Sequence, residues 1–240
     1  MTSSQTFAAA DRLAVVGEAA DRPALRVAAS SQGERKLVTV MFVDVTSSMD
    51  LSREIELESW GSLINVLFEL MCESVYEFGG WVANFTGDGI EAVFEATDAT
   101  NEHALQACTA ALWLRDAVRG PAAKLRVEHG LELSLRIGIH SGDVLTGTVG
   151  ARYKRYYTAN GYAVALAKRI EGLARPGQIC LTEHTGALVA GILKVHELGA
   201  FDVKGADRQV GVVELVGSAP RGTHNNTDRV RRSTHRRDRR

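Results

Sequence analysis

The sequence lacks long apolar runs: no stretch of eighteen consecutive apolar residues occurs, so no membrane-spanning helix is predicted. Its first residues also lack the basic-then-apolar order of a secretory signal, because Asp11 and Arg12 interrupt an alanine run. Cysteine is scarce, with three among 240 residues and no pair at zinc-ligand spacing. These absences argue against a membrane protein, a disulfide framework and a zinc site. They predict a reduced, cytoplasmic protein.

Charge is distributed unevenly along the chain. The last twenty residues hold eight arginines and two aspartates, so they carry a formal charge of +6, and because the whole chain is at −1, the first 220 residues are at −7. We expect residues 1–33 to be a disordered segment and residues 218–240 a basic, disordered tail, since neither has apolar partners for a core. Between them, residues 34–217 are predicted to form one domain.

Apolar periodicity predicts strands and helices in mixed order across this domain. Strands are predicted at 36–45, 81–86, 90–94, 133–140, 144–149, 179–181, 195–198 and 210–215, and helices at 55–78, 99–118, 164–173 and 182–190. The order β-α-β-β-α-β, followed by further α and β elements, predicts an α+β fold with a ferredoxin-like split βαβ sheet. In that plan helices cover one face of a largely antiparallel sheet, and the other face stays open for a ligand or partner.

Two carboxylates are placed to share a ligand. Asp44 ends the first predicted strand, and Asp88 lies at the tip of the glycine-flanked turn that joins the next two strands. Strand ends that are neighbours in a sheet can bring such groups within reach of one cation, and Mg²⁺ or Mn²⁺ prefers hard oxygen ligands of this kind. The competing interpretation is that Asp44 caps a helix and Asp88 is an ordinary turn residue.

Hydroxyl residues follow Asp44 directly, at the predicted start of a helix. They are Thr46, Ser47 and Ser48. Free backbone N–H groups at a helix start attract anions, so this segment is a candidate for contacts with phosphate. The same residues are also ordinary helix caps.

Several motifs, in this order, resemble the catalytic domain of class III nucleotide cyclases, in particular its small bacterial, actinobacterial-like members. They are FVDV (Phe42–Val45), NFTGDGIEAVF (Asn84–Phe94), LRIGIHSGDVLTGTVG (Leu135–Gly150), YTANGYAVALAKRIE (Tyr157–Glu171), RPGQICLT (Arg175–Thr182) and FDVKG (Phe201–Gly205). The resemblance covers about residues 36–216. It implies a head-to-tail homodimer that converts a nucleoside triphosphate to a 3′,5′-cyclic nucleotide and pyrophosphate at its interface.

The metal site implied by this resemblance holds two Mg²⁺ or Mn²⁺ ions per active site. Asp44 and Asp88 match the two metal-binding aspartates, and the backbone carbonyl of Val45 matches a further ligand. In two-metal phosphoryl transfer one ion activates the attacking hydroxyl, here the ribose 3′-hydroxyl, and the other neutralises the leaving pyrophosphate.

The resemblance also implies that the partner protomer supplies the groups that stabilise the transition state. Arg169 matches the transition-state arginine, but Ala165 stands where the family has an asparagine, one helical turn before it. Lys204 matches the lysine that holds the triphosphate. Lys154, or its neighbour Arg155, is a candidate for a further phosphate contact.

Base selection in adenylyl cyclases uses a lysine together with an aspartate or threonine. Asn84 occupies the lysine position and Thr158 the other, whereas the guanylyl-type pair of glutamate and cysteine is absent from these positions. The Asn84 amide can donate to adenine N1, and the Thr158 hydroxyl can accept from the N6 amino group. ATP is therefore the expected substrate and GTP the less favoured one.

Three functions compete on these observations. The first is an adenylate cyclase of weak activity, since the loss of one polar transition-state contact at Ala165 commonly costs on the order of 10²–10³ in rate. The second is a catalytically silent nucleotide-binding regulator, or a subunit active only in a heterodimer. The third is nucleic-acid binding by the arginine tail, which is less favoured because no helix-turn-helix or aromatic stacking motif accompanies it.

Overall fold

The computed structural model describes residues 33–96, 101–151 and 154–218. The expectations for residues 1–32 and for the tail beyond Ser218 lie outside these ranges and stay predictions. The elements, in chain order, are β1 (Glu34–Val45), α1 (Ser48–Glu54), α2 (Leu57–Glu77), β2 (Trp81–Phe85), β3 (Ile90–Glu95), α3 (Glu102–Ala117), α4 (Arg119–His129), β4 (Leu135–Ala151), β5 (Lys154–Asn160), α5 (Tyr162–Leu173), β6 (Ile179–Thr182), α6 (Glu183–Leu188), β7 (Leu193–Phe201) and β8 (Val210–Ser218).

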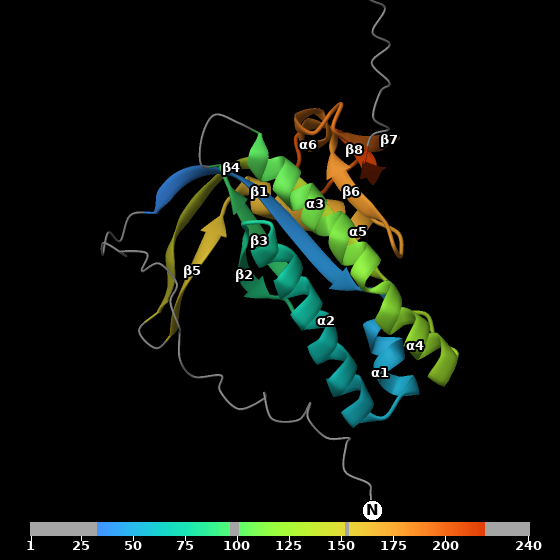
Figure 1. The fold of residues 1–240 in the computed structure, drawn as a ribbon. Coiled ribbons are helices and arrows are strands. Elements are labelled where there is room, and N and C mark those ends of the chain that lie inside the picture. Colours follow the sequence, from blue (N-terminus) through green and yellow to red (C-terminus); the bar gives the residue numbers. More distant parts are fainter. Residues whose placement is uncertain (1–32, 97–100, 152–153, 219–240) are drawn as a thin grey trace, which may run out of the picture. The chain divides into compact units, whose positions relative to one another are not determined.

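The described strands form one sheet with the order β2-β3-β1-β4-β6-β8-β7, and β5 pairs with the far end of β4 (Figure 1). β1 lies between β3 and β4 and runs antiparallel to both, whereas β4 and β6 are parallel. The first four strands have the order of the split βαβ plan, and β6 to β8 extend the sheet beyond β4. The predicted α+β class is confirmed, together with the added C-terminal elements.

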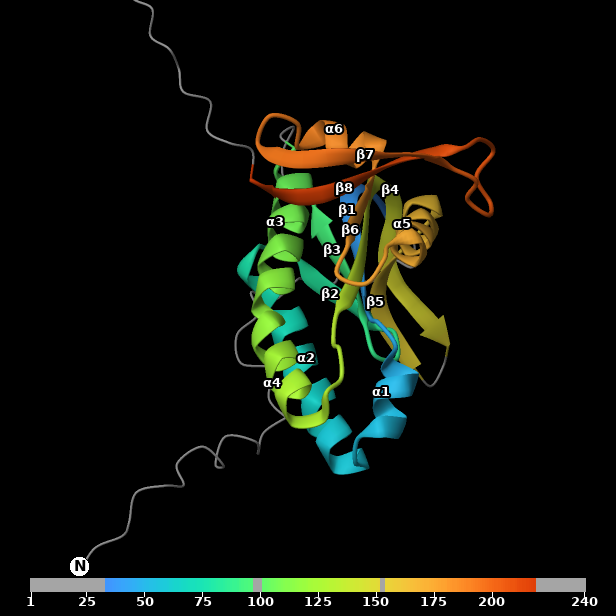
Figure 2. The ribbon, with the colours of Figure 1, turned by 90° about the vertical axis from the view of Figure 1, so that its right-hand side faces the viewer.

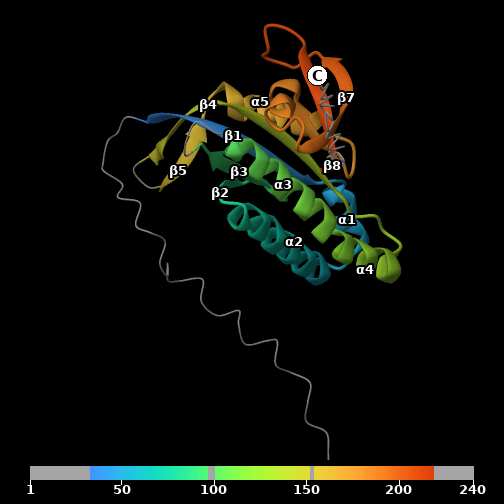
Figure 3. The same cartoon turned by 45° about the horizontal axis from the view of Figure 1, so that its top comes forward.

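Helices cover both faces of the sheet (Figures 2 and 3). On one face α2 and α3 pack over Met41 and Val43 in the larger core cluster. On the other face α5 packs over Phe42 through Ala163 and Ala167. The expectation of helices on one face only is therefore wrong. The short side chains of α5 let this helix lie close against the strands and cover part of the second face.

Two predicted element boundaries differ from the structure in the first helical region. The predicted helix 55–78 is α2, and the separate helix α1 precedes it. Ile55 and Glu56 have extended backbone between the two helices, because the buried side chain of Ile55 joins the core there. The periodicity of the apolar residues continues across this break, so the sequence pattern did not reveal it.

The second helical region is longer than predicted. The sequence predicted an end at Val118, but α4 begins directly afterwards and continues to His129. Pro121 is its third residue, and proline is tolerated in the first turn, where its missing N–H has no helical partner. Two predicted strands around Gly142 are likewise one continuous strand, β4, because Gly142 keeps its pairing with Val38 of β1.

The three cysteines are all unbonded, which confirms that no disulfide framework supports this fold. Burial raises the pKa of the Cys108 thiol to about 12, and burial together with Glu214 raises that of Cys180 to about 11. Both thiols are therefore protonated and unreactive at neutral pH. Among the described helices, none has the length and apolar character needed to cross a membrane.

Candidate active site

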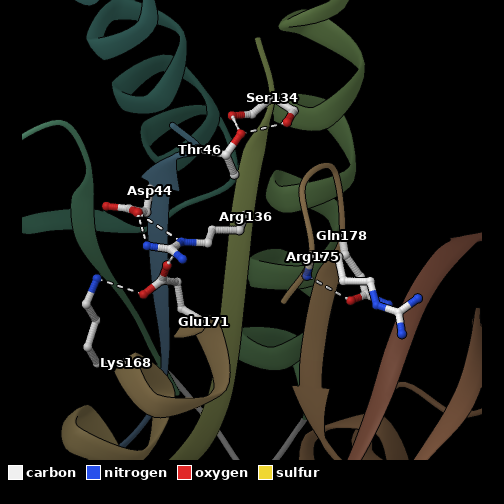
Figure 4. A network of polar contacts seen from close by, with 8 residues as sticks. All are labelled: Asp44, Thr46, Ser134, Arg136, Lys168, Glu171, Arg175 and Gln178. Atoms are coloured by element: carbon white, nitrogen blue, oxygen red, sulfur yellow. Dashed lines mark hydrogen bonds and ion pairs between the residues drawn. The ribbon is translucent and has the colours of Figure 1, made fainter. Parts of the chain in front are cut away.

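Asp44 lies at the end of β1, opposite Arg136 at the beginning of β4. Its side chain is nearly buried, with 9% of the residue exposed. One carboxylate oxygen, Oδ2, accepts two hydrogen bonds from Arg136, from Nε at 2.9 Å and from Nη2 at 2.6 Å (Figure 4). The central strand thus ends in a carboxylate that a guanidinium holds in a fixed position.

Asp88 lies in the tight turn between β2 and β3, and this turn packs against the end of β1. The backbone N–H of Thr86 donates to the carbonyl of Gly89 at 2.9 Å and closes the turn. A Cβ at Gly89 would lie 2.1 Å from the carbonyl oxygen of Val43 and 3.1 Å from the Cα of Asp44, so only glycine permits this approach. The structure therefore brings the two predicted carboxylates to the same end of the sheet.

Arg136 also contacts α5, through a carboxylate that the sequence motifs did not single out. Its Nε lies 2.5 Å from Oε1 of Glu171, a residue only 1% exposed, and Lys168 Nζ lies 2.7 Å from the other oxygen (Figure 4). Gly138 makes this possible, since a Cβ there would lie 2.0 Å from the backbone nitrogen of Glu171. The result is a chain of alternating charges from Asp44 to Lys168.

This network favours the charged form of Arg136. Burial lowers the pKa of Arg136, but the hydrogen bond to Asp44 and the charges of Glu171 and both aspartates outweigh burial and raise it. Because Asp88 contributes to this effect, the charges of both aspartates act on the Arg136 guanidinium. An arginine between the apolar residues Leu135 and Ile137, at the start of the strand, was the sequence signal that could have revealed this role.

The donor set at this end of the sheet fits a divalent cation that also binds phosphate. Two carboxylates and a strand-end carbonyl are hard oxygen ligands, and Mg²⁺ and Mn²⁺ complete such sets with water and phosphate oxygens. Val45 contributes only its backbone here, since its side chain is 2% exposed in the core. The described residues hold no cluster of three or more potential metal-binding side chains, so further oxygen ligands of a cation at Asp44 and Asp88 would be water or phosphate oxygens.

The three hydroxyl residues after β1 have unequal roles. Thr46 is used structurally, because its N–H and its hydroxyl both bond to Ser134 at 2.8–2.9 Å (Figure 4). Ser47 is the N-cap of α1, but its side chain makes no capping hydrogen bond and its backbone is left-handed, with φ 55°. The prediction of a side-chain cap at this helix is therefore wrong. Contacts of Ser47 and Ser48 with phosphate stay a prediction.

The two residues expected to select the base lie in direct contact. Nδ2 of Asn84 in β2 donates to Oγ1 of Thr158 in β5 at 3.2 Å and to Oε2 of Glu91 in β3 at 2.7 Å. Thr158 and Glu91 are 4% and 5% exposed. The Asn84–Thr158 contact thus includes a buried carboxylate that sequence reasoning did not assign to it. The pairing of Asn84 with Glu91 across the β2–β3 hairpin explains this position.

The remaining predicted residues lie on other elements than Asp44 and Asp88. Ala165 and Arg169 are exposed, one turn apart on the side of α5 opposite to its buried residues, and Lys204 is exposed in the loop between β7 and β8. Within the described residues, no ion pair joins Arg169 or Lys204 to Asp44 or Asp88. Lys154 begins β5, but its side chain lies outside the described part of the structure.

Among the described residues, the histidines take part in no metal-binding cluster. His140 is mostly buried, and its Nδ1 lies 2.8 Å from Oγ1 of Thr182. Burial and the neighbouring His184 lower the pKa of His140 to about 4, so its ring is neutral at physiological pH. This agrees with the structural role that its strand position indicates.

The chain resembles known proteins in sequence and in fold. Residues 31–215 match the family described as the adenylate and guanylate cyclase catalytic domain. Adenylate cyclase 1 of Rhizobium meliloti is 32% identical over 187 residues, which is 76% of this chain and 28% of that protein. The adenylate cyclase of Anabaena cylindrica is 31% identical over 139 residues, 58% of this chain and 27% of that protein. The chain therefore spans less than a third of the length of these relatives.

Solved structures of the same kind share the fold. The adenylyl cyclase CyaB from P. aeruginosa has a TM-score of 0.75 at 28% identity, covering 78% of this chain and 97% of that chain. The guanylyl cyclase Cya2 has a TM-score of 0.71 at 25% identity, covering 80% and 98%. An adenylyl cyclase and a guanylyl cyclase thus both have folds similar to this one, so the fold itself does not select the base.

Proposed function

The chain belongs to the family of adenylate and guanylate cyclase catalytic domains, and we propose that it converts a purine nucleoside triphosphate to a 3′,5′-cyclic nucleotide and pyrophosphate. One observation carries this proposal. The end of β1 gathers two carboxylates and a guanidinium, while the arginine and lysine expected at the same reaction are exposed elsewhere. Such a division is expected when two copies of the chain complete each other's sites.

We therefore propose a two-fold homodimer with shared active sites. One protomer would supply Asp44, Asp88 and the carbonyl of Val45 as ligands for two Mg²⁺ or Mn²⁺ ions, which when bound supply activation of the 3′-hydroxyl and neutralisation of the pyrophosphate. The partner would present Arg169 to the charge that develops on the transferred phosphoryl group, and Lys204 to the triphosphate.

Arg136 has two tasks in this proposal. Without substrate it neutralises Asp44, which keeps a nearly buried carboxylate from being left unpaired. With a cation at Asp44, the guanidinium becomes free to bind a phosphate oxygen, for which its planar donors are well suited. Glu171 and Lys168 keep the head group at the strand end during this exchange. Arg136 is thus proposed as a phosphate-binding residue in addition to Lys204, Lys154, Ser47 and Ser48.

Ala165 limits the expected rate. The proposed transition state lacks a polar contact at this exposed position of α5, and such a contact commonly contributes on the order of 10²–10³ in rate. A catalytically silent nucleotide-binding subunit, active only beside a different cyclase partner, is the second candidate that this residue favours. The sequence predicted ATP and the adenylate cyclases among the relatives favour it, but the base that the active enzyme takes depends on the orientation of the Asn84 amide.

The deciding experiment is product identification with the purified chain. Incubation with Mn²⁺ and either ATP or GTP, followed by chromatography and mass spectrometry, is expected to show 3′,5′-cyclic nucleotide and pyrophosphate. Asp44→Asn should abolish product, whereas Asp143→Asn should not, since Asp143 forms an exposed ion pair with Arg35 away from the site. Nucleotide binding without product by a verified homodimer would instead support the silent subunit.

A further inference from the structure

Glu91 is a buried carboxylate in a position that the fold does not require to be charged. It lies on β3 between Ile90 and Ala92, whose side chains point into the larger core cluster, so Glu91 faces the opposite side of the sheet. Its direct neighbours across the strands are Phe42 in β1 and Asn84 in β2. An apolar residue would fit this surrounding without loss of any ion pair, because Glu91 has none among the described contacts.

The polar contacts of Glu91 are incomplete. Oε2 accepts one hydrogen bond, from Nδ2 of Asn84 at 2.7 Å, whereas Oε1 is buried and has no hydrogen-bond partner among the described residues. Burial raises the pKa of Glu91, and the bond from Asn84 offsets only part of this effect. A buried group with such poor compensation is costly, so its presence calls for a role.

Glu91 fixes the direction of the Asn84 amide. The amide nitrogen of Asn84 faces the Glu91 carboxylate and donates to it, so the carbonyl oxygen of Asn84 faces away from Glu91. The second amide hydrogen is used as well, because Nδ2 also donates to Oγ1 of Thr158 at 3.2 Å. Oδ1 of Asn84 takes part in no hydrogen bond among those described, and Asn84 is partly exposed. The group left for a ligand is therefore an acceptor.

We infer that Glu91 is a positioning residue for base selection, which presents Asn84 as an acceptor and makes the site prefer guanine to adenine. This inference rests on the proposed cyclase function and changes the choice of base that the sequence predicted. Asn84 was expected to donate to adenine N1, but both of its N–H groups are directed to Thr158 and Glu91.

Guanine has two adjacent groups, N1–H and O6, that match the acceptor of Asn84 and the donor of Thr158. Its N1–H can donate to Oδ1 of Asn84, and its O6 can accept from the Thr158 hydroxyl, whose present bond to the carbonyl of Ala159 is long at 3.4 Å. Adenine would place the acceptor N1 against the acceptor Oδ1. Turning the amide to avoid this would place Oδ1 against the Glu91 carboxylate and would leave two acceptors facing each other.

The test compares kcat/KM for GTP, ATP and inosine triphosphate in the homodimer with Mn²⁺. Inosine triphosphate keeps the N1–H and O6 of guanine but lacks its exocyclic amino group. The parent protein is expected to use GTP and inosine triphosphate at least about 10-fold better than ATP, because a site with a fixed acceptor discriminates against a second acceptor. A preference for ATP in the parent would overturn the inference.

Glu91→Gln is the informative variant, because its amide can donate to Oδ1 of Asn84 and so permits the reversed orientation. We expect the GTP-to-ATP ratio to fall at least about 10-fold, mainly through KM, as for a change in ground-state binding. Glu95→Gln is the matched control. Glu95 lies four residues after Glu91 on the same face of β3, but it accepts hydrogen bonds from Lys36 and Trp81 instead. An unchanged ratio in Glu91→Gln would refute the positioning role, since loss of a merely structural carboxylate would not alter base preference.

Binding measured without turnover separates this inference from the proposed activity. Fluorescent mant-GTP and mant-ATP are titrated into the parent and into Glu91→Gln, and Asn84→Leu provides a second variant that should bind both nucleotides without preference. A preference for mant-GTP that is lost in both variants supports the inference even if no cyclic product forms. Product formation with equal use of both bases would uphold the cyclase and overturn the inference, and binding of neither nucleotide would also overturn it.

Discussion

Asp44 and Glu91 are carboxylates on neighbouring strands, and both are nearly buried, yet their surroundings differ. Asp44 accepts two hydrogen bonds from the guanidinium of Arg136, while Glu91 accepts one from the neutral amide of Asn84 and has an oxygen without a partner among the described residues. A metal ion can replace the cationic Arg136 as the partner of Asp44, so these surroundings suit the exchange of a guanidinium for a metal ion. The Glu91 carboxylate instead orients the neutral amide of Asn84, so these surroundings suit recognition of a ligand by that amide.

The largest expected effect is on turnover and comes from the loss of the Asp44 carboxylate. Asp44→Ala should lower cyclase turnover by at least about 10²–10³-fold, because it removes a ligand of the proposed ions and leaves Arg136 without its main partner. Turnover is measured with Mn²⁺ and saturating nucleotide, and circular dichroism checks the fold. A folded Asp44→Ala protein with parental turnover would mean that this carboxylate belongs to structure alone.

Complementation between protomers tests whether Asp44 of one protomer and Arg169 of its partner belong to the same active site. Neither Asp44→Ala nor Arg169→Ala should be active alone, but a mixture should form heterodimers in which one of the two sites is complete. Random mixing makes half of the dimers mixed, so about a quarter of the parental activity is expected for a two-fold dimer. Native mass spectrometry verifies the heterodimers, and their inactivity would contradict sharing in trans.

A smaller gain is expected at the exposed side of α5. Ala165→Asn should raise kcat about 10-fold or more with little change in KM, because it adds a polar group one turn before Arg169 where the transition state lacks one. The helix should tolerate the change, since alanine to asparagine costs about 0.7 kcal/mol at most. A soluble dimer with unchanged kcat would show that this position does not face the reacting phosphate.

The smallest expected effect is on stability, and it separates Glu91 from an ordinary core residue. The pKa of Glu91 is raised in the folded protein above its ordinary value of 4.5, so its ionisation opposes folding as pH rises above that value. Glu91→Leu should therefore be more stable than the parent at pH 8, by about 1–3 kcal/mol, the usual cost of an unsatisfied buried polar group. The gain should shrink toward pH 5. Thermal unfolding at both pH values measures it, and a destabilised variant at pH 8 would contradict this view.

The sequence predicted the strand ends well because short motifs determine them. Asp44 follows a β-branched run, and the Gly87–Gly89 turn around Asp88 has few conformations available, so the meeting of these carboxylates followed from the predicted sheet. The resemblance also assigned Asn84 and Thr158 to base selection, whereas their direct contact is seen only in the structure. The positions of the two strand ends thus depend on short local motifs.

The partners of these residues were not predicted, because they depend on strand register and helix approach. Arg136 lies opposite Asp44 only in the observed register of β1 and β4, and a shift of one residue would turn it to the other face. Glu171 reaches Arg136 only because Gly138 lets α5 approach β4. In the sequence Glu91 is an ordinary polar residue of a strand, and only the register of β2 and β3 places it beside Asn84.

The close packing of α5 on Gly138 has a consequence for a dimer of this chain. Within one turn this helix carries Glu171, which holds Arg136 at the metal end of its own protomer, and Arg169, which the proposal assigns to the partner's site. A ligand that draws Arg136 away from Glu171 would alter the support of the same turn that presents Arg169 across the interface. The two sites would then be coupled thermodynamically, so that occupancy of one changes the affinity of the other, and reciprocally.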